Sequence, residues 1–197
     1  MTQEQLNQFI TELIDALDSM VPVHGPFRRD LAPMIREQKY TIRQPLLIPP
    51  AYAQLAWYTV DVVVIATEMD DDGQENVVRI ILPGQIFTDL FSFFKHKPSR
   101  TKFTPITEGN LLVIRKPDYK MLEIYQETQE LVRHIMLMEK EAEAARSHLM
   151  SQRPKEKFAL FTRNYPFADL PNKYCASYLK LDEADYSRLK ADYLKNL

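Results

Sequence analysis

Glycine is scarce in this chain, which has four glycines among 197 residues. Walker and Rossmann loops need clustered glycines, because their backbone must approach a phosphate closely. The glycines of this chain are isolated from one another, so the sequence excludes both kinds of nucleotide-binding loop. They are Gly25, Gly73, Gly84 and Gly109.

Cysteine, long apolar runs and excess positive charge are also lacking. The single cysteine, Cys175, cannot form an intramolecular disulfide, which favours a reducing compartment such as the cytoplasm. No apolar run reaches the roughly 18 residues of a membrane-spanning helix, and the polar N-terminus has no signal-peptide core. We therefore expect no membrane partner. The formal net charge of -2 excludes a generally polybasic nucleic-acid binder, although a local basic patch is compatible with it.

Catalytic and metal-binding motifs are absent from the sequence. It contains no Gly-x-Ser-x-Gly, no His-Glu-x-x-His and no Cys-x-x-Cys. The four histidines are scattered, and the two on the predicted long helix, His134 and His148, lie too far apart to share one metal ion. The sequence therefore predicts a protein that is not an enzyme and has no metal site and no resident cofactor.

The N-terminal half predicts helices followed by short strands. Apolar residues recur at helical spacing over residues 1–20, and a weaker helical pattern covers residues 28–38. Because Pro33 lies inside the second pattern, a helix there is expected to start near this proline. Asp72-Gly73 predicts a solvated hairpin turn, since both residues tolerate positive φ. Short strands with tight turns are typical of a β-roll or a small barrel. The predicted strands cover residues 40–48, 58–66, 76–82, 101–107 and 110–115.

Residues 128–152 predict one long helix, because the segment has no glycine or proline and is rich in Glu, Ala, Met and Leu. Its apolar residues are spaced alternately by four and three, which is a heptad seam. The seam consists of Leu131, Ile135, Met138, Ala142, Ala145 and Leu149. It favours a parallel homodimer, in which Glu141 attracts Arg146 of the second copy and His134 attracts Glu139. A core within one chain is the alternative.

The C-terminal segment predicts a helix-turn-helix after a polar hinge at residues 151–157. Helices are expected at about residues 172–179 and 182–196, with Ala176 as the small residue where they cross. Asp182 can cap the second helix. A motif of this kind places its second helix in the major groove of DNA. The alternative is a plain helical hairpin that has no partner.

Residues 173–181 and 186–190 carry a resemblance to a known family. Their sequences, Lys-Tyr-Cys-Ala-Ser-Tyr-Leu-Lys-Leu and Tyr-Ser-Arg-Leu-Lys, resemble the helix-turn-helix of the Crp–Fnr superfamily of bacterial transcription regulators. The long helix is similar to the family's dimerisation helix. Further upstream, the likeness to its cyclic-nucleotide-binding β-roll is carried by residues 69–73, 83–90 and 93–99. The resemblance covers roughly residues 25–197, and it implies a homodimeric, cytoplasmic, DNA-binding regulator with an N-terminal sensor domain.

The resemblance also indicates where an effector would bind. Cyclic-nucleotide binders have Gly-Glu-Leu where this chain has Thr88-Asp89-Leu90, so the glycine that approaches the ribose is missing. Arg100 is close to the family's phosphate-binding arginine but is not in register with it. We therefore predict no binding of cyclic AMP and expect, at most, a different small anion. Its predicted contacts are Thr88, Asp89, Arg100 and Thr101.

For DNA, the resemblance implies that Arg188 contacts a base and that Ser187 lies beside it. Lys180 occupies the turn position that the family usually gives to glycine, which requires either a strained left-handed backbone at Lys180 or a modified turn. Three carboxylates at residues 182–185 oppose the approach of phosphates. The predicted DNA-binding residues are Lys173, Lys180, Glu183, Ser187, Arg188 and Lys190.

The predicted fold is therefore α+β: a cyclic-nucleotide-binding-like β-roll with flanking helices, a long dimerisation helix and a C-terminal helix-turn-helix. The predicted domains are a sensor at residues 1–127, the dimerisation helix at 128–152 and the DNA-binding-like domain at 153–197. The predicted function is transcription regulation by a DNA-binding homodimer that does not respond to cyclic AMP. The alternative is a ligand-sensing or protein-interaction module whose helix-turn-helix is a relic.

Overall fold

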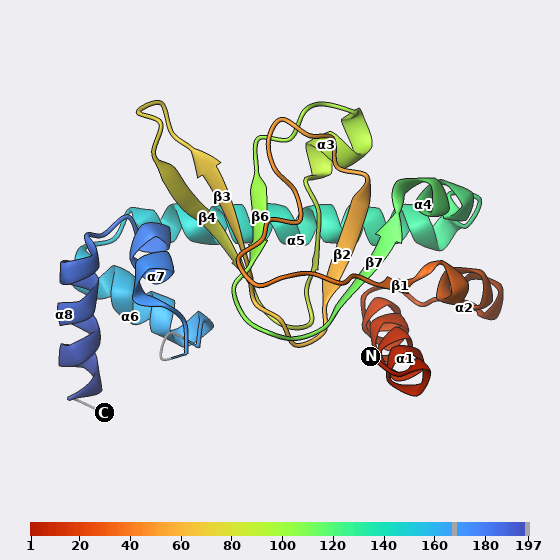
Figure 1. Cartoon of the computed structure of the whole chain (residues 1–197), viewed down its shortest axis with the longest axis horizontal. Helices are drawn as coiled ribbons and strands as arrows, with labels where there is room; N and C mark the ends of the chain where they lie inside the picture. Colours follow the sequence, from red (N-terminus) through yellow and green to blue (C-terminus); the bar gives the residue numbers. More distant parts are fainter. Residues whose placement is uncertain (167–168, 196–197) are drawn as a thin grey trace. The chain divides into compact units, whose positions relative to one another are not determined.

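The computed structural model describes residues 1–166 and 169–195, and its helices and antiparallel sheets confirm the predicted α+β class (Figure 1). The chain forms two compact units. Met1–Ala66 and Ile80–Met138 make the first unit, and Thr67–Arg79 and Glu139–Leu197 make the second. The tip of one β-hairpin thus belongs to the same unit as the C-terminal helices. The three domain boundaries predicted from the sequence stay a prediction.

The first unit begins with helix α1, Gln3–Met20, as predicted. Thr2 and Gln5 start this helix with a reciprocal capping box. The prediction that a helix within residues 28–38 starts near Pro33 is wrong. Helix α2 (Gly25–Leu31) precedes a single 3-10 turn (Ala32–Met34), and the chain then becomes extended. Pro33 has no amide hydrogen and cannot lie inside an α-helix that started before it.

Within the described residues, seven short strands form two antiparallel sheets. The first sheet has the order β1-β7-β2-β5, and the second has the order β4-β3-β6. Trp57 pairs with Val113 on one side and with Phe87 on the other, which fixes the register in the middle of the first sheet. The strands are β1 Arg36–Glu37, β2 Leu55–Thr59, β3 Val64–Met69, β4 Glu75–Ile81, β5 Ile86–Phe87, β6 Lys102–Pro105 and β7 Leu111–Arg115.

The predictions of strands at residues 40–48 and 58–66 are wrong. Residues 40–48 form no strand and make only one isolated bridge, between Leu47 and Phe103. Prolines at positions 45, 49 and 50 lack the amide hydrogens that a ladder needs, and Arg43 has a φ of 65°. The predicted strand 58–66 is divided between β2 and β3, because the chain turns at residues 60–63. The hairpin turn at Asp72-Gly73 is confirmed, with a φ of 76° at Gly73.

The remaining regular elements of the described residues are helices. Short helices α3 (Leu90–Lys95) and α4 (Lys116–Leu122) belong to the first unit, where Leu122 joins a core built by α1, α2 and the first sheet. Helix α5 runs over Gln126–Met150 and confirms the predicted long helix. The second unit continues with α6 (Pro154–Asn164), α7 (Asn172–Leu179) and α8 (Glu183–Leu194).

The predicted end of the last helix, at residue 196, lies outside the described residues. Over the described part of the chain, no helix is both long and apolar enough to cross a membrane.

Candidate functional site

Helices α7 and α8 form the predicted helix-turn-helix. Lys180 ends α7 with φ 51° and ψ 48°, which confirms the left-handed turn residue. The Leu181 amide donates to the carbonyl of Ala176 at 3.0 Å, and this bond closes the turn. Asp182 then starts α8, since its carboxylate accepts the Ala184 amide at 2.8 Å and confirms the predicted cap. The turn is therefore built by local hydrogen bonds that its sequence indicates.

A buried lysine holds the end of α7 from the neighbouring helix. Lys157 on α6 is 8% exposed, and its Nζ donates to the carbonyl of Leu179 at 3.1 Å. An ammonium group at a helix C-terminus also interacts favourably with the helix dipole. Sequence reasoning missed Lys157, because it lies in a polar Lys-Glu-Lys segment that is typical of a solvated hinge.

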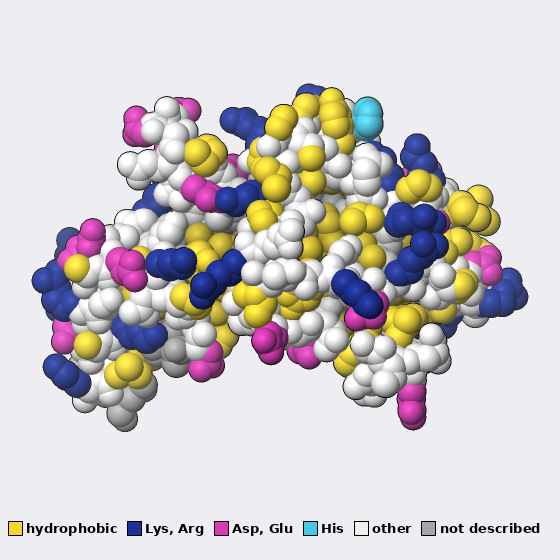
Figure 2. Space-filling view, in the orientation of Figure 1, with side chains coloured by type: hydrophobic (Ala, Val, Ile, Leu, Met, Phe, Trp, Pro, Cys, Tyr) yellow, Lys and Arg dark blue, Asp and Glu magenta, His cyan; other side chains and the backbone are white. Residues whose placement is uncertain are grey.

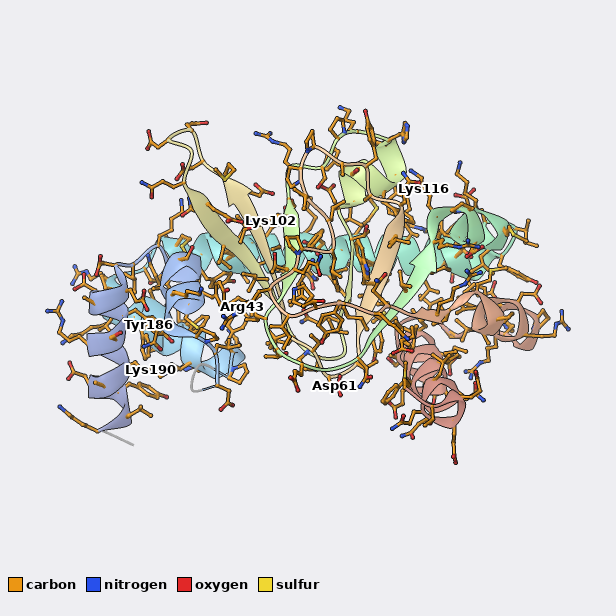
Figure 3. The ribbon with its side chains drawn as sticks, in the orientation of Figure 1. Arg43, Asp61, Lys102, Lys116, Tyr186 and Lys190 are labelled. Carbon is orange, nitrogen blue, oxygen red and sulfur yellow. The ribbon has the colours of Figure 1, made fainter. Side chains whose placement is uncertain are left out.

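The interior between α6, α7 and α8 is aromatic. Tyr186, which Figure 3 labels on α8, is fully buried. Its ring packs edge-to-face on Phe158, with 5.4 Å between the ring centroids. Its hydroxyl lies beside Cys175. Burial raises the pKa of the Cys175 thiol, so the thiol is neutral and unreactive at neutral pH. This position fits the small buried hydrophobe that the sequence suggests for Cys175.

Two of the predicted DNA-binding residues take part in packing between the helices. Asn172, the first residue of α7, donates to Ser187 Oγ at 3.2 Å and accepts from Lys190 Nζ at 3.1 Å. Ser187 and Lys190 are half-buried as a result. They fix α8 against the start of α7, so their side chains have a structural task in addition to any contact with DNA.

The other four predicted residues are exposed. Arg188 forms an ion pair with Asp185 one turn earlier on α8. Lys173 lies over the ring of Tyr174 at 4.6 Å from the centroid. Lys180 and Glu183 lie at the turn and at the start of α8. On the face that Figure 2 shows, basic and acidic side chains are interspersed over these helices.

The predicted effector residues in the first unit mostly bind other parts of the chain. Thr88 donates to the carbonyl of Leu55 at 2.9 Å. Asp89 caps α3 through the Ser92 amide and accepts a hydrogen bond of 2.7 Å from Ser99, which is 2% exposed. The Thr101 amide donates to the same Ser99 hydroxyl. Arg100 is exposed.

Three aromatic rings fill the space between the two sheets. Trp57 and Phe87 come from the first sheet and Phe103 comes from the second, and none is more than 3% exposed. The Trp57 and Phe87 rings are stacked at 5.3 Å, and Phe103 lies 5.2 Å from Phe87. This cluster occupies the interior with the protein's own side chains. A flat ligand could enter it only by displacing them.

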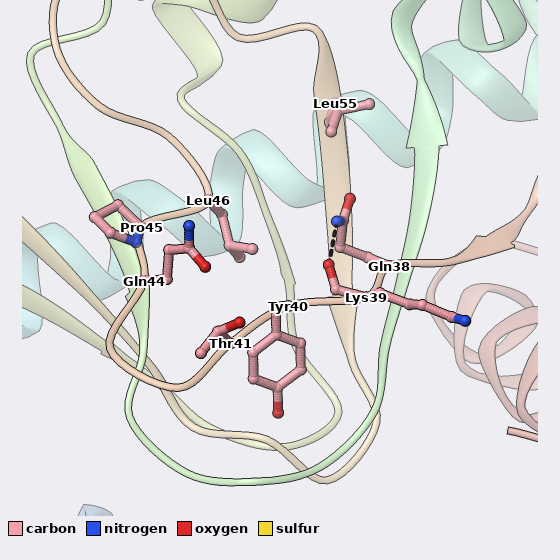
Figure 4. Close-up of a pocket in the computed structure, with 8 residues that line it drawn as sticks. All are labelled: Gln38, Lys39, Tyr40, Thr41, Gln44, Pro45, Leu46 and Leu55. Carbon is pink, nitrogen blue, oxygen red and sulfur yellow. Dashed lines mark hydrogen bonds between the residues drawn. The ribbon is translucent and has the colours of Figure 1, made fainter.

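A separate hollow of about 280 Å³ lies in the first unit, at the segment before β2 (Figure 4). Tyr40 closes one side, and its hydroxyl donates to the carbonyls of Thr107 and Gly109. No charged group is buried in its wall. The hollow is lined by Gln38, Lys39, Tyr40, Thr41, Gln44, Pro45, Leu46 and Leu55.

The predicted dimer seam of α5 is only partly free. Leu131 and Leu149 are 5% and 7% exposed, because each is buried within its own chain, and Ile135 is half-buried. Met138, Ala142 and Ala145 are exposed. The ends of the seam are thus buried within the chain, whereas Met138, Ala142 and Ala145 in its middle are exposed, and the dimer through this seam stays a prediction.

Two of the charged residues predicted to pair across the dimer, Glu139 and Arg146, bind groups of their own chain. Glu139 forms an ion pair with Arg79 of β4, and Arg146 donates to the carbonyl of Val77. Both bonds lie within the second unit. The heptad pattern predicts that these residues lie beside the seam between two helices. It cannot indicate which element of the same chain packs against them.

The structure of this chain is similar to the solved structures of several known proteins. The structure of FixK2 from Bradyrhizobium japonicum matches with a TM-score of 0.71 and 16% identity, over 82% of this chain and 85% of that chain. A transcriptional regulator of the crp/fnr family from Eubacterium rectale matches with 0.69 and 7% identity, over 88% and 85%. CLP of Xanthomonas campestris, a c-di-GMP-responsive global regulator, matches with 0.67 and 12% identity, over 88% and 93%.

No protein-family model matches the sequence, and no curated protein matches it. The similarity to known proteins is therefore a similarity of backbone structure. At these low sequence identities it shows a shared fold and no more. It extends over most of the chain in each of the three structures. The chain thus has the fold of the Crp–Fnr transcription regulators, as its sequence motifs predict.

Proposed function

We propose that this protein is a cytoplasmic, DNA-binding transcription regulator that acts as a homodimer. The observation that carries the proposal is the helix-turn-helix, whose second helix is capped, ordered and exposed at Glu183 and Arg188. Arg188 is the side chain for a base contact, because arginine can bind guanine through two hydrogen bonds in the major groove. Lys173, Lys180 and Lys190 are the candidates for phosphate contacts.

Helix α5 supports the homodimer. Met138, Ala142 and Ala145 form an exposed apolar stripe in the middle of a 25-residue helix. Two copies that pair along this stripe in parallel would present two copies of α8 to the same DNA. We expect their centres to be about 34 Å apart, the spacing of successive major grooves on one side of the duplex.

We further propose that the protein does not respond to cyclic AMP. Two observations support this. The rings of Trp57, Phe87 and Phe103 occupy the interior between the sheets, and the Asp89 carboxylate is bound by the Ser92 amide and the Ser99 hydroxyl. Calorimetry should detect no binding at micromolar cyclic AMP. An anion of another kind would find Arg100 exposed and the backbone of Thr88 and Asp89 nearby.

Selection of bound sequences from a random pool of double-stranded DNA, at low salt, tests the proposal. We expect an enriched sequence with two half-sites. Arg188→Ala should weaken its binding by about 1–3 kcal/mol and relax the preference at one base pair. Arg163→Ala is the matched control, because Arg163 is an exposed arginine on α6 outside the helix-turn-helix.

The second candidate function is a protein-interaction or ligand-sensing module that does not bind DNA. The carboxylates of Asp182, Glu183 and Asp185 favour it, because they lie where α8 would meet phosphates. Lack of any selected sequence, for the parent protein and for Asp185→Lys alike, would contradict the regulator and leave the module.

A further inference from the structure

An apolar surface is exposed around helix α3 of the first unit. Phe91, on α3, is 70% exposed, and Ile48 and Tyr52, in the segment that precedes β2, are 55% and 43% exposed. In Figure 2, hydrophobic side chains gather over these two elements. Large apolar side chains that are grouped on the surface of a folded chain mark a site of interaction. We call Ile48, Tyr52 and Phe91 the apolar platform.

The two segments that carry the platform are fixed to each other. The Ala53 amide donates to Ser92 Oγ at 2.8 Å, and both residues are fully buried. Tyr52 and Phe91 come directly before these two residues along the chain. The Tyr52 ring also lies 4.7 Å from the ring of His96, the residue that ends α3. The platform is therefore ordered before a partner arrives, so less conformational entropy is lost upon binding.

Basic side chains accompany the platform. Lys95 lies one turn after Phe91 on α3, so these two side chains share one face of the helix. Lys97 and Arg100 follow α3, and all three cations are exposed. This part of the surface is thus rich in positive charge, although the chain as a whole has a formal net charge of -2.

Acidic side chains are missing from the same two segments. Residues 40–60 and 90–107 contain no Asp or Glu. Asp89, directly before α3, accepts hydrogen bonds from the Ser92 amide and the Ser99 hydroxyl, so its carboxylate is bound within the chain. The segments that carry the platform therefore supply no carboxylate to neutralise its cations.

We propose that the platform and its cations bind an acidic segment of another protein, with apolar side chains among its carboxylates. Protein interfaces have an apolar centre with aromatic anchors and a polar rim, and the exposed Phe91 ring with a lysine beside it has this composition. Carboxylates of the partner would pair with Lys95, Lys97 and Arg100, which speeds association and orients the segment. The proposal does not rest on DNA binding, because all of these residues lie in the first unit.

Two other negatively charged partners fit this surface less well. A single strand of nucleic acid stacks its bases on aromatic rings, but Ile48 is aliphatic and the Tyr52 ring already lies close to that of His96. A helix that lies on a membrane presents an apolar face over several turns. Helix α3 has only six residues, and its Ser92 and Phe93 are buried in the chain.

Selection from a displayed library of random short peptides, on the immobilised full chain, tests the proposal. We expect enriched peptides that have several Asp or Glu residues and at least one large apolar residue. The same selection on Phe91→Ala should lose these peptides. Absence of any enriched peptide, or enrichment without an acidic bias, would refute the proposal.

Fluorescence anisotropy with a labelled enriched peptide measures the apolar part of the site. Phe91→Ala should weaken binding about five- to thirtyfold, because burial of the exposed ring is lost. Met121→Ala is the matched control and should leave the affinity unchanged, since Met121 is a 62% exposed apolar residue on α4 of the same unit. Equal effects of the two variants would contradict the platform.

The charged part of the site is measured with Lys95→Gln/Lys97→Gln. This double variant should weaken peptide binding about three- to tenfold at low salt, and the loss should shrink as salt rises. Lys39→Gln/Lys120→Gln is the control, because it removes the same charge from exposed positions of the first unit. An equal loss in the control, or no loss in either, would refute the charge complementarity on which the proposal depends.

A single-stranded oligothymidine and vesicles of phosphatidylcholine and phosphatidylserine test the two other partners. Binding of either probe that Phe91→Ala abolishes, without an acidic peptide from the selection, would overturn the proposal and assign the surface to that class of partner. Selection of double-stranded DNA by the parent protein is a separate measurement. Failure of the proposed regulator function therefore leaves the peptide result standing, and loss of the peptide result leaves the regulator standing.

Discussion

If the protein forms the proposed homodimer, Met138→Glu is expected to convert it into monomers. Met138 lies on α5 in the exposed middle of the heptad seam, and it is 46% exposed in the single chain. Full burial of a methionine side chain contributes about 1.5–3 kcal/mol, so covering the remaining half contributes about 1 kcal/mol per copy. Two copies lose about 2 kcal/mol, which weakens dimerisation about 30-fold.

The introduced charge adds to this loss. In a parallel pair the two introduced carboxylates would face each other across the seam, and each would lose water on association. A buried, unpaired charge costs several kcal/mol, so the total effect should exceed a thousandfold in the dissociation constant. Ile135 is less suitable for this experiment, because it is half-buried within its own chain and a charge there would also destabilise the fold.

Met136→Glu is the matched control. Met136 is 44% exposed, nearly the same as Met138, but it lies about 200° away around the helix. Sedimentation velocity at micromolar concentration should show a dimer for the parent and for Met136→Glu, and a monomer for Met138→Glu. Circular dichroism should be the same for all three. A Met138→Glu dimer, or equal dissociation by both variants, would refute the seam.

Three further predictions concern stability. Lys180→Gly should stabilise the second unit by about 0.5–1 kcal/mol in thermal unfolding, because Lys180 has a positive φ that glycine adopts without strain; destabilisation would mean that the lysine side chain supports the turn. Tyr186→Phe should change stability by less than about 0.5 kcal/mol, since the Tyr186 hydroxyl is buried beside Cys175 without a nitrogen or oxygen partner among the described residues; a loss above about 1 kcal/mol would reveal a good hydrogen bond. Arg115 donates two hydrogen bonds to Asp118 and holds the pKa of that carboxyl below its ordinary 3.8. The ionised Asp118 therefore stabilises the fold above that pH, and this stabilisation is lost as the pH falls through the folded-state pKa of Asp118. Asp118→Asn should lower the free energy of unfolding at neutral pH by about 1 kcal/mol, and it should reduce the loss of stability that acidification to about pH 3 causes. An unchanged acid sensitivity of the variant would contradict this.

The elements that the sequence predicts well are those with local signals. The left-handed turn at Lys180 and the cap at Asp182 depend on residues within a few positions, and both are confirmed. The same holds for the long helix, whose segment has no glycine or proline, and for the hairpin at Asp72-Gly73. Here local propensity and tertiary packing favour the same conformation, so the sequence alone is sufficient.

The sequence-based predictions are wrong or incomplete where contacts between distant parts of the chain determine the structure. The run at residues 40–48 has β-forming side chains, but its flanking prolines leave it one bridge, at Leu47. The heptad spacing of α5 identifies an apolar stripe but not what covers it, so Leu131 and Leu149 are buried by their own chain. Lys157 was missed for the same reason, since its partner is a backbone carbonyl 22 residues away. A side chain that binds a distant backbone group leaves no pattern in the sequence.

The exposed arginine that is our candidate for a base contact has an acid of the same helix beside it. Arg188 on α8 is paired with Asp185 one turn earlier. A phosphate or a base would therefore displace an intramolecular carboxylate in order to bind this arginine. This exchange would reduce the net gain in affinity, although it would leave the geometry of a base contact intact. Non-specific DNA binding depends on free cations, whereas recognition of a base depends on direction and hydrogen bonding. If the proposed DNA binding holds, a helix-turn-helix with this arrangement should lose more of its general affinity for DNA than of its sequence preference, so specific sites should stand out against other DNA despite the low positive charge.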